Sequence, residues 1–215
     1  MVESVDQSVG QVMDTLKRLG LEENTLVIFT SDNGGLSVEE GANTPATSNA
    51  PLREGKGYLY EGGIRVPFIF KLPGVIESGS VSSVPICSID LFPTILELAG
   101  VGEVQTNGEI DGISILPVLQ GKGEIEREAL YWHYPHFSNQ GGRPGGAIRQ
   151  GEYKLIERYE DGTLQLYNLV DDISETVNLA HELPEKTREL ADKLIAWRER
   201  VKANMPVVNP LMVEQ

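Results

Sequence analysis

The hydrophobic positions of the first hundred residues switch between helical and extended spacing. Residues 9–19 carry apolar side chains at helical intervals, and Gly20 follows as a residue suited to end a helix. Residues 25–30 form a short apolar run rich in β-branched and aromatic side chains, which predicts the central strand of a sheet covered on both sides. Residues 65–71 predict a second strand, and residues 88–100 predict a helix that ends at a glycine.

The second half of the chain has a different pattern. Three short strands are predicted, at residues 147–149, 153–158 and 164–169. The turn pairs that end in Gly151 and Gly162 separate them, which indicates an antiparallel meander. A final helix is predicted at residues 184–202, with Leu190, Leu194 and Trp197 on its buried face. A boundary between two parts of the chain is expected near residues 120–130.

Composition and charge exclude several classes of partner. The 215 residues include 18 Lys and Arg against 32 Asp and Glu, a net charge of −14. This charge argues against nucleic acid and against an anionic membrane surface, because both require a basic face. No apolar run approaches the roughly 20 residues of a membrane-spanning helix. The single cysteine, Cys87, excludes an internal disulfide, and the first residues lack the features of a signal peptide.

Asp32 and Asn33 directly follow the first predicted strand. Open α/β sheets place ligand groups at this end of their strands. A carboxylate beside a side-chain amide offers two oxygen donors, the ligand type that Ca²⁺ and Mg²⁺ prefer. The alternative is a simple β-turn, because Asn-Gly after a strand is a strong turn signal.

Lys56 lies between two glycines in a long polar loop, residues 34–63. Backbone without side chains allows a ligand to approach closely, and an ammonium group there can bind an oxygen of a phosphate or sulfate. Glu61 and Arg65 are four residues apart and are expected to form an ion pair that braces this loop. The alternative is a solvated lysine in a mobile loop.

Residues 131–137 form an aromatic-rich segment that contains His136. One interpretation places His136 and residues 140–143 at the rim of a glycan pocket. The other, which we favour, is an aromatic strand that supplies core area. Arg149 and Lys154, on the predicted meander, are expected to be structural.

Four segments, taken in order, resemble the sulfatase family. Residues 25–35, 55–70, 88–101 and 147–180 are similar to the C-terminal half of a sulfatase of the arylsulfatase type, with its alkaline-phosphatase-like superfold. The resemblance implies an α/β fold in which residues 1–125 are the C-terminal part of the sulfatase sheet. Residues 126–215 would then form a small antiparallel β subdomain with a packed C-terminal helix.

The resemblance also assigns roles to individual residues. Asp32 and Asn33 match the family's second pair of Ca²⁺ ligands, with Mg²⁺ as an alternative ion, and Lys56 matches the catalytic lysine that contacts the substrate sulfate. The family's nucleophile is a formylglycine made from a Cys/Ser-x-Pro-x-Arg segment. Cys87 does not fit that motif, and the nearest spacing, residues 49–53, has Asn49 at the nucleophile position. The formylglycine is therefore expected in an N-terminal half that these residues do not include.

The implied function is hydrolysis of sulfate esters of a carbohydrate or an aryl compound. Its partner would be a sulfated small molecule or glycan, and the chain by itself is expected to be inactive. Two alternatives stay open. One is a phosphate or phosphonate ester hydrolase of the same superfold, and the other is a non-catalytic glycan-binding subunit.

Overall fold

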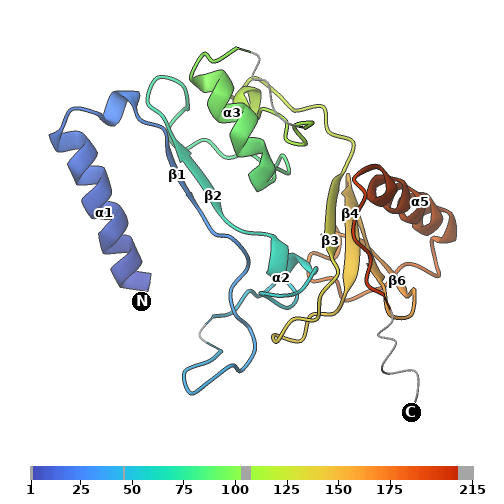
Figure 1. Cartoon of the computed structure of the whole chain (residues 1–215). Coiled ribbons are helices and arrows are strands. Elements are labelled where there is room, and N and C mark those ends of the chain that lie inside the picture. Colours follow the sequence, from blue (N-terminus) through green and yellow to red (C-terminus); the bar gives the residue numbers. More distant parts are fainter. Residues whose placement is uncertain (1, 46, 103–107, 208–215) are drawn as a thin grey trace. The chain divides into compact units, whose positions relative to one another are not determined.

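The structure, a computed structural model, describes residues 2–45, 47–102 and 108–207. The chain divides into two compact units (Figure 1). The first unit, which we call unit 1, joins Met1–Thr30 to Pro67–Arg127. The second, unit 2, joins Ser31–Val66 to Glu128–Gln215. Among the described residues, no helix is both long and apolar enough to cross a bilayer.

Unit 1 consists of helices and a two-stranded antiparallel sheet. Its elements are α1 (Val2–Arg18), η1 (Glu22–Asn24), β1 (Val27–Thr30), β2 (Phe68–Lys71), η2 (Ser88–Asp90), α3 (Leu91–Leu98) and α4 (Leu116–Leu119). The helical spacing of residues 9–19 correctly predicts α1, and Gly20 follows it with a φ of 68°. None of the described side chains of α1 is buried.

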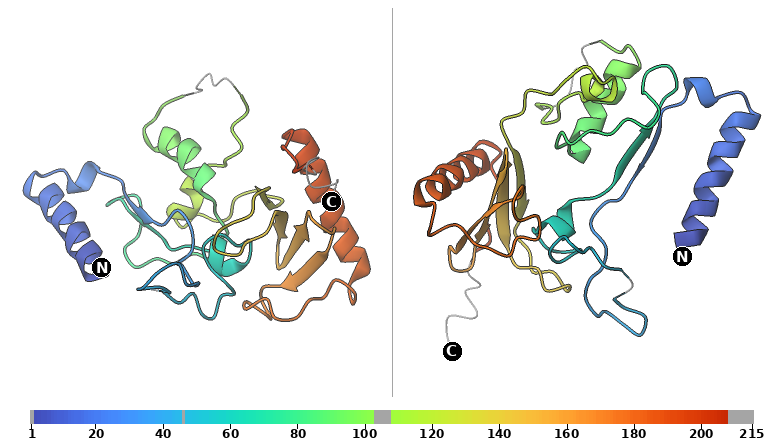
Figure 2. Two further views of the ribbon diagram at one scale, coloured as in Figure 1. Left: turned by 60° about the horizontal axis from the view of Figure 1, so that its bottom comes forward. Right: turned by 180° about the vertical axis from the view of Figure 1, so that it is seen from behind.

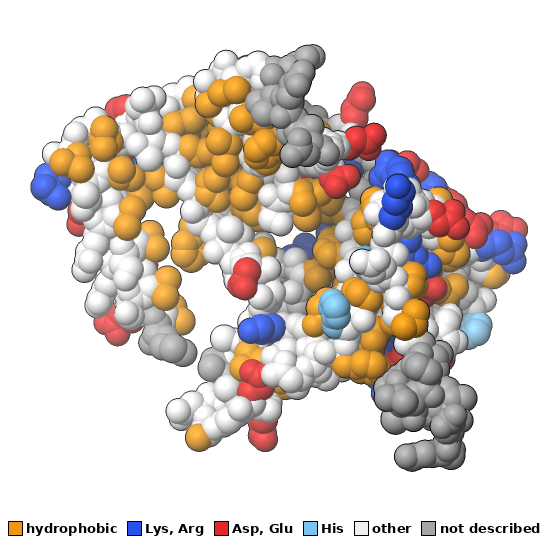
Figure 3. Space-filling view, in the orientation of Figure 1, with side chains coloured by type: hydrophobic (Ala, Val, Ile, Leu, Met, Phe, Trp, Pro, Cys, Tyr) orange, Lys and Arg blue, Asp and Glu red, His pale blue; other side chains and the backbone are white. Residues whose placement is uncertain are grey.

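The prediction of a strand buried on both faces is wrong for β1. Among the described residues, β1 pairs with β2 alone, in an antiparallel ladder that places Phe29 opposite Ile69. These two side chains are 39% and 58% exposed, because a two-stranded ladder leaves one of its faces without cover here. Figure 3 shows hydrophobic side chains at the surface over β1, β2 and α3.

The start of α3 is stabilised by one buried carboxylate. Asp90 accepts hydrogen bonds from the backbone N–H groups of Cys87 (2.7 Å) and Ile113 (3.0 Å), and it pairs with Arg127. The N–H group of Cys87 would otherwise be unpaired at the beginning of the helical segment. The helix predicted over residues 88–100 is confirmed as η2 followed by α3.

Unit 2 is built on a four-stranded antiparallel meander. Its elements are α2 (Glu61–Ile64), β3 (Leu130–Tyr134), β4 (Gly145–Gln150), β5 (Tyr153–Arg158), β6 (Leu164–Asn168) and α5 (Pro184–Arg200), and the strand order is β3-β4-β5-β6. The predicted meander and final helix are confirmed. The predicted turn glycines, Gly151 and Gly162, adopt φ values of 57° and 69°, which are unfavourable for other residues.

One face of this sheet is covered by α5 (Figures 1 and 2). Because side chains alternate along a strand, Ile148, Leu155 and Leu166 share this face and form a buried cluster with Leu190 and Leu194 of α5. Trp197 is less buried and stacks on Tyr131 of β3, with ring centroids 5.0 Å apart. The helix is thus attached to the sheet by an aliphatic core and one aromatic stack.

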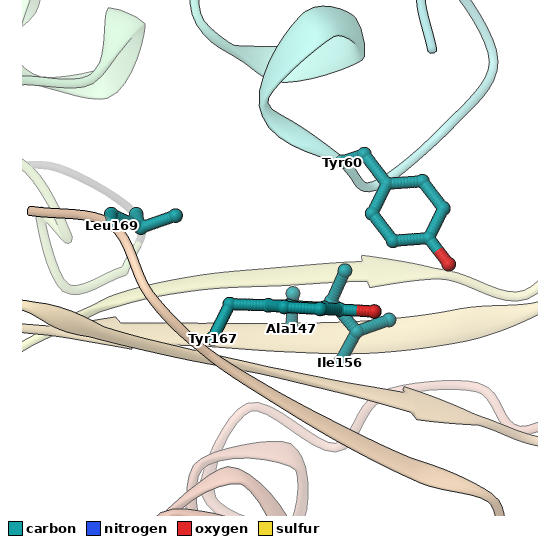
Figure 4. Packing of buried hydrophobic residues seen from close by; sticks show 5 residues of the cluster. All are labelled: Tyr60, Ala147, Ile156, Tyr167 and Leu169. Carbon is teal, nitrogen blue, oxygen red and sulfur yellow. The ribbon is translucent and has the colours of Figure 1, made fainter. Parts of the chain in front are cut away.

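The opposite face of the sheet carries the loop that contains α2. Tyr60 stands over a second buried cluster, which it forms with Ala147, Ile156, Tyr167 and Leu169 (Figure 4). The Tyr60 hydroxyl donates a hydrogen bond to Gln165 Oε1 at 2.8 Å. Tyr60 therefore packs the segment that contains α2 against the meander.

Candidate functional site

Asp32 and Asn33 lie in a bend directly after β1, and they belong to unit 2. Asp32 is exposed and Asn33 is half-buried. The Ser31 hydroxyl donates a hydrogen bond to the backbone carbonyl of Asn33 at 2.8 Å. The two candidate ligand side chains are thus carried on a hydrogen-bonded bend whose backbone geometry is partly fixed.

This bend continues into a segment that is hydrogen-bonded to the Lys56 loop. The Lys56 N–H donates to the carbonyl of Gly35 at 3.1 Å, and the Gly34 N–H donates to the carbonyl of Gly63 at 2.9 Å. Lys56 itself is exposed. The structure therefore places the Asp32–Asn33 bend and Lys56 on neighbouring, directly bonded stretches of backbone.

Glycine is required at this junction because the backbones approach so closely. A Cβ atom on Gly34 would lie 1.7 Å from the carbonyl oxygen of Gly62, and one on Gly55 would lie 2.2 Å from that of Gly35. Both distances are far shorter than any real carbon–oxygen contact. The glycines that flank the candidate residues are thus needed for packing, whatever ligand the site binds.

Asn49 stands in the sequence only as a misfit to the nucleophile motif, but its side chain has three backbone contacts at this junction. Its side chain accepts a hydrogen bond from the N–H of Gly35 (3.0 Å) and donates to the carbonyls of Gly35 (2.8 Å) and Glu54 (2.9 Å). Asn49 therefore connects the segment after Asn33 to the segment before Lys56. No spacing rule identifies such a contact, because its partners are set by the folded loop.

The far end of the Lys56 loop is attached to the meander by buried charges. The predicted ion pair between Glu61 and Arg65 is confirmed, with Nε and Oε2 2.5 Å apart. Lys154 is fully buried, and its ammonium lies 3.0 Å from Glu61 Oε1 and 2.9 Å from Glu175 Oε1. Glu175 also accepts a hydrogen bond from the N–H of Glu61 at 2.6 Å. One lysine of the sheet thus holds two carboxylates.

The two carboxylates respond differently to this environment. Burial disfavours ionisation of Glu61, but Lys154 and Arg65 outweigh it and hold the pKa of Glu61 below its ordinary value. For Glu175, burial dominates over the attraction of Lys154, and its pKa is raised. Glu61 is therefore the carboxylate whose charge the network stabilises, which agrees with its larger number of basic neighbours.

His136 is exposed, and its ring meets Tyr134 edge-on with centroids 5.4 Å apart. The aromatic strand that we favoured for this segment is confirmed as far as Tyr134, where β3 ends, whereas His136 lies beyond the strand and outside the core. The turn that follows is held to other loops of unit 2, because Asn139 donates to Glu40 Oε1 at 2.6 Å. A Cβ on Gly142 would lie 1.7 Å from the carbonyl of Gly57, so this turn packs against the residue after Lys56.

The donor set of the bend suits a hard divalent cation but is small. Asp32 and Asn33 bring a carboxylate and an amide oxygen, whereas Ca²⁺ takes six to eight oxygen ligands. Within residues 2–45, 47–102 and 108–207, no three or more His, Cys, Asp or Glu side chains form a group able to hold a metal ion. Asp32 and Asn33 fit part of a Ca²⁺ site, and the other ligand atoms would have to come from groups other than these two side chains.

Two family models match the chain. The model described as "Sulfatase" matches residues 1–101, and that described as "N-sulphoglucosamine sulphohydrolase, C-terminal" matches residues 55–202, which is more than half of the chain. The chain therefore belongs to the sulfatase family, and it corresponds to the C-terminal part of these proteins.

Curated relatives agree with this assignment. A "Sulfatase" of Formosa agariphila is 41% identical over 230 residues, which cover 95% of this chain and 39% of the relative. The steryl-sulfatase of Rattus norvegicus is 43% identical over 135 residues, which cover 62% of this chain and 23% of the relative. The chain thus spans less than half the length of the relatives that it matches.

Solved structures share the fold. The crystal structure of Ps i-CgsB in complex with k-i-k-neocarrahexaose superimposes on this chain with a TM-score of 0.78 at 30% identity. The match covers 92% of this chain and 41% of the Ps i-CgsB chain. A second protein, solved in complex with its substrate D-glucosamine-2-N,6-O-disulfate, gives a TM-score of 0.76 at 29% identity over 95% of this chain and 40% of that chain. The α/β fold expected for the C-terminal part of a sulfatase is confirmed.

Proposed function

We propose that this chain supplies the sulfate-binding part of a sulfuric ester hydrolase that acts on a sulfated carbohydrate. The observation that carries the proposal is that the segment after the Asp32–Asn33 bend is hydrogen-bonded to the Lys56 loop. The Lys56 N–H donates to the Gly35 carbonyl. Family membership supports the reaction class. The junction brings oxygen donors and an ammonium group onto adjacent backbone.

The proposed roles follow from the chemistry of these side chains. Asp32 and Asn33 would hold a divalent cation, Ca²⁺ by preference and Mg²⁺ as the alternative, which when bound neutralises charge on the sulfate. Lys56 would bind a sulfate oxygen as a point charge. The attacking formylglycine is proposed to lie in polypeptide outside these 215 residues, so the chain alone is expected to show no turnover.

The acidic composition is compatible with an anionic substrate. A pair of unit charges about 4 Å apart interacts with about 4 kcal/mol at an effective dielectric near 20. Charges on the distant surface are screened beyond about 8 Å at physiological salt. A bound cation together with Lys56 would therefore dominate the potential at the site, although the net charge of the chain is −14.

A carbohydrate is the substrate class that the comparisons favour. Two structures that match more than nine tenths of this chain contain a carbohydrate ligand, whereas the match to the steryl-sulfatase covers 62% of it. His136 is exposed near the turn that packs on Gly57, and we propose that it contacts the sugar at the rim of the site. An aryl sulfate is the alternative substrate for the same hydrolysis reaction.

The test uses residues 1–215 joined behind the N-terminal part of the Formosa agariphila relative that the chain does not match. The hybrid should hydrolyse an aryl sulfate and a 6-O-sulfated glucosamine, with higher kcat/KM for the sugar, and turn over an aryl phosphate poorly. Lys56→Ala should lower kcat/KM about 10²–10³-fold if the ammonium stabilises transition-state charge. Lys122→Ala, at another exposed lysine, is the matched control and should change it less than twofold.

Three outcomes would count against the proposal. Preference for the phosphate ester would indicate a phosphate or phosphonate hydrolase. Saturable binding of the sulfated sugar without any turnover would indicate a glycan-binding subunit. Activity of Lys56→Ala equal to that of the control would remove Lys56 from the mechanism.

A further inference from the structure

We propose that Asn49 is a positioning residue, which holds the Asp32–Asn33 bend and Lys56 in register through Gly35 and Glu54. It is not a substitute for a nucleophile, although it occupies that position in the nearest match to the nucleophile motif. This role rests on the proposed function, because register between the two segments matters only if both contact one ligand.

The hydrogen bonds of Asn49 define a clasp, by which we mean its amide group with the backbone of Gly35 and Glu54. The amide oxygen accepts a hydrogen bond from the N–H of Gly35, and the two N–H donors of the amide group donate to the carbonyls of Gly35 and Glu54. Both donors of the side chain are thereby used. The Gly35 carbonyl also receives the N–H of Lys56, so a single backbone oxygen links the clasp to the candidate sulfate-binding residue.

The strained backbone of Glu54 is a second observation that supports a positioning role for Asn49. Its φ of 58° lies in the left-handed region, which costs a residue with a Cβ atom free energy and persists only where the surroundings impose it. The bond from Asn49 to the Glu54 carbonyl fixes this conformation two residues before Lys56. Strain of this kind is concentrated at functional sites, where it directs a side chain.

Arg53, the last residue of the same motif, is attached to a different part of unit 2. Its guanidinium donates to the carbonyl of Glu175 at 2.7 Å and to the Tyr167 hydroxyl at 3.3 Å, and it stacks 4.0 Å from the centre of the Tyr60 ring. Arg53 is therefore attached to the meander, while Asn49 is attached to the segment after the bend. Asn49 and Arg53 thus connect the segment before Lys56 both to Gly35 and to the meander, which gives this spacing a structural role.

The first experiment measures exchange of backbone amides by NMR in the 215-residue chain. Asn49→Asp keeps the size and the acceptor but points an oxygen at two carbonyls, and Asn49→Ala removes the clasp. In both variants the amides of Gly35 and Lys56 should exchange about tenfold faster, while those of the β4–β5 ladder keep their rates. Asn43→Asp makes the same charge change at an exposed asparagine of the same loop and should alter neither set.

The second experiment measures kinetics in the hybrid enzyme. A misplaced sulfate-binding group lowers the rate of the bound complex, so Asn49→Asp should lower kcat about 10²-fold and change KM less than threefold, whereas Asn43→Asp should alter neither. Unchanged amide exchange, or faster exchange with unchanged kcat, would overturn the role of Asn49. If the wild-type hybrid hydrolyses no sulfate ester, the proposed function fails, and amide exchange alone then decides whether the clasp holds the loop.

Discussion

The two faces of the β3–β6 sheet differ in the kind of buried contact that attaches other parts of the chain to them. Under α5, the fully buried contacts are aliphatic and include Leu155, Leu190 and Leu194, while an aromatic stack and the ion pair of Arg198 with Glu157 lie at the less buried edge. On the other face, which we call the charged face, a buried cluster around Tyr60 is joined by a charged lysine, Lys154, paired with two carboxylates from outside the sheet. A hydrophobic contact tolerates small shifts, whereas a buried charge requires its partners at defined distances.

This difference indicates which face positions the site. The aliphatic face attaches a helix, and the charged face attaches the loop that carries Lys56. A buried ion pair is a poor source of net stability compared with apolar packing, but breaking it is costly. We therefore interpret the charged face as the one that fixes the geometry of residues 53–65, and the helix face as the one that keeps the sheet folded.

The largest expected effect comes from breaking the charged face. Lys154→Met removes the ammonium and leaves Glu61 and Glu175 buried without their shared cation, which should cost about 3–5 kcal/mol of unfolding free energy. Urea unfolding measures this loss. Lys193→Met, at a partly exposed lysine of α5, is the control and should leave the midpoint nearly unchanged. A loss below about 1 kcal/mol in Lys154→Met would contradict the importance of the pair.

A cavity on the helix face should cost about as much or slightly less. Leu194→Ala is expected to lower the unfolding free energy by about 2–5 kcal/mol, because the fully buried side chain leaves a void under α5. The comparison predicts that the two variants differ at the site. The Lys56 amide should exchange faster in Lys154→Met and stay near the wild-type rate in Leu194→Ala. Equal changes of the Lys56 exchange rate in the two variants would show that the charged face has no special effect on the Lys56 loop.

The smallest effect concerns alkaline pH. Burial, followed by the nearby Tyr60 hydroxyl, raises the pKa of Tyr167 on the charged face from 10 to about 12. The folded state therefore resists ionisation, so this contribution to stability is complete below pH 10 and is lost as pH rises through 12. Tyr167→Phe should make the fall of unfolding free energy between pH 10 and 12 shallower. Tyr153→Phe, on the helix side, is the control, and equal slopes in both variants would contradict the assignment.

Local patterns in the sequence predicted much of this fold. The alternating strands and glycine turns identified the meander, helical spacing identified α1 and α5, and the four-residue spacing identified the pair of Glu61 and Arg65. These features succeed because each depends on residues that are close in sequence. The exposure of β1 was mispredicted, because an apolar strand has the same pattern whether or not another layer covers it.

The framework of the site could be predicted only in part. Asp32, Asn33 and Lys56 were identified by chemistry and resemblance, and the structure places their segments side by side. The roles of Asn49 and of Glu175 were not predicted. Asn49 acts through backbone partners, and Glu175 lies more than a hundred residues from Glu61, so neither contact leaves a local pattern.

The most direct test of the account is a crystal structure of the hybrid enzyme soaked with Ca²⁺ and inorganic sulfate. We expect a cation bound by oxygens of Asp32 and Asn33, and the Lys56 ammonium at hydrogen-bonding distance from a sulfate that touches this cation. A Lys56 side chain directed away from the bound sulfate, or a cation bound without Asp32, would contradict it.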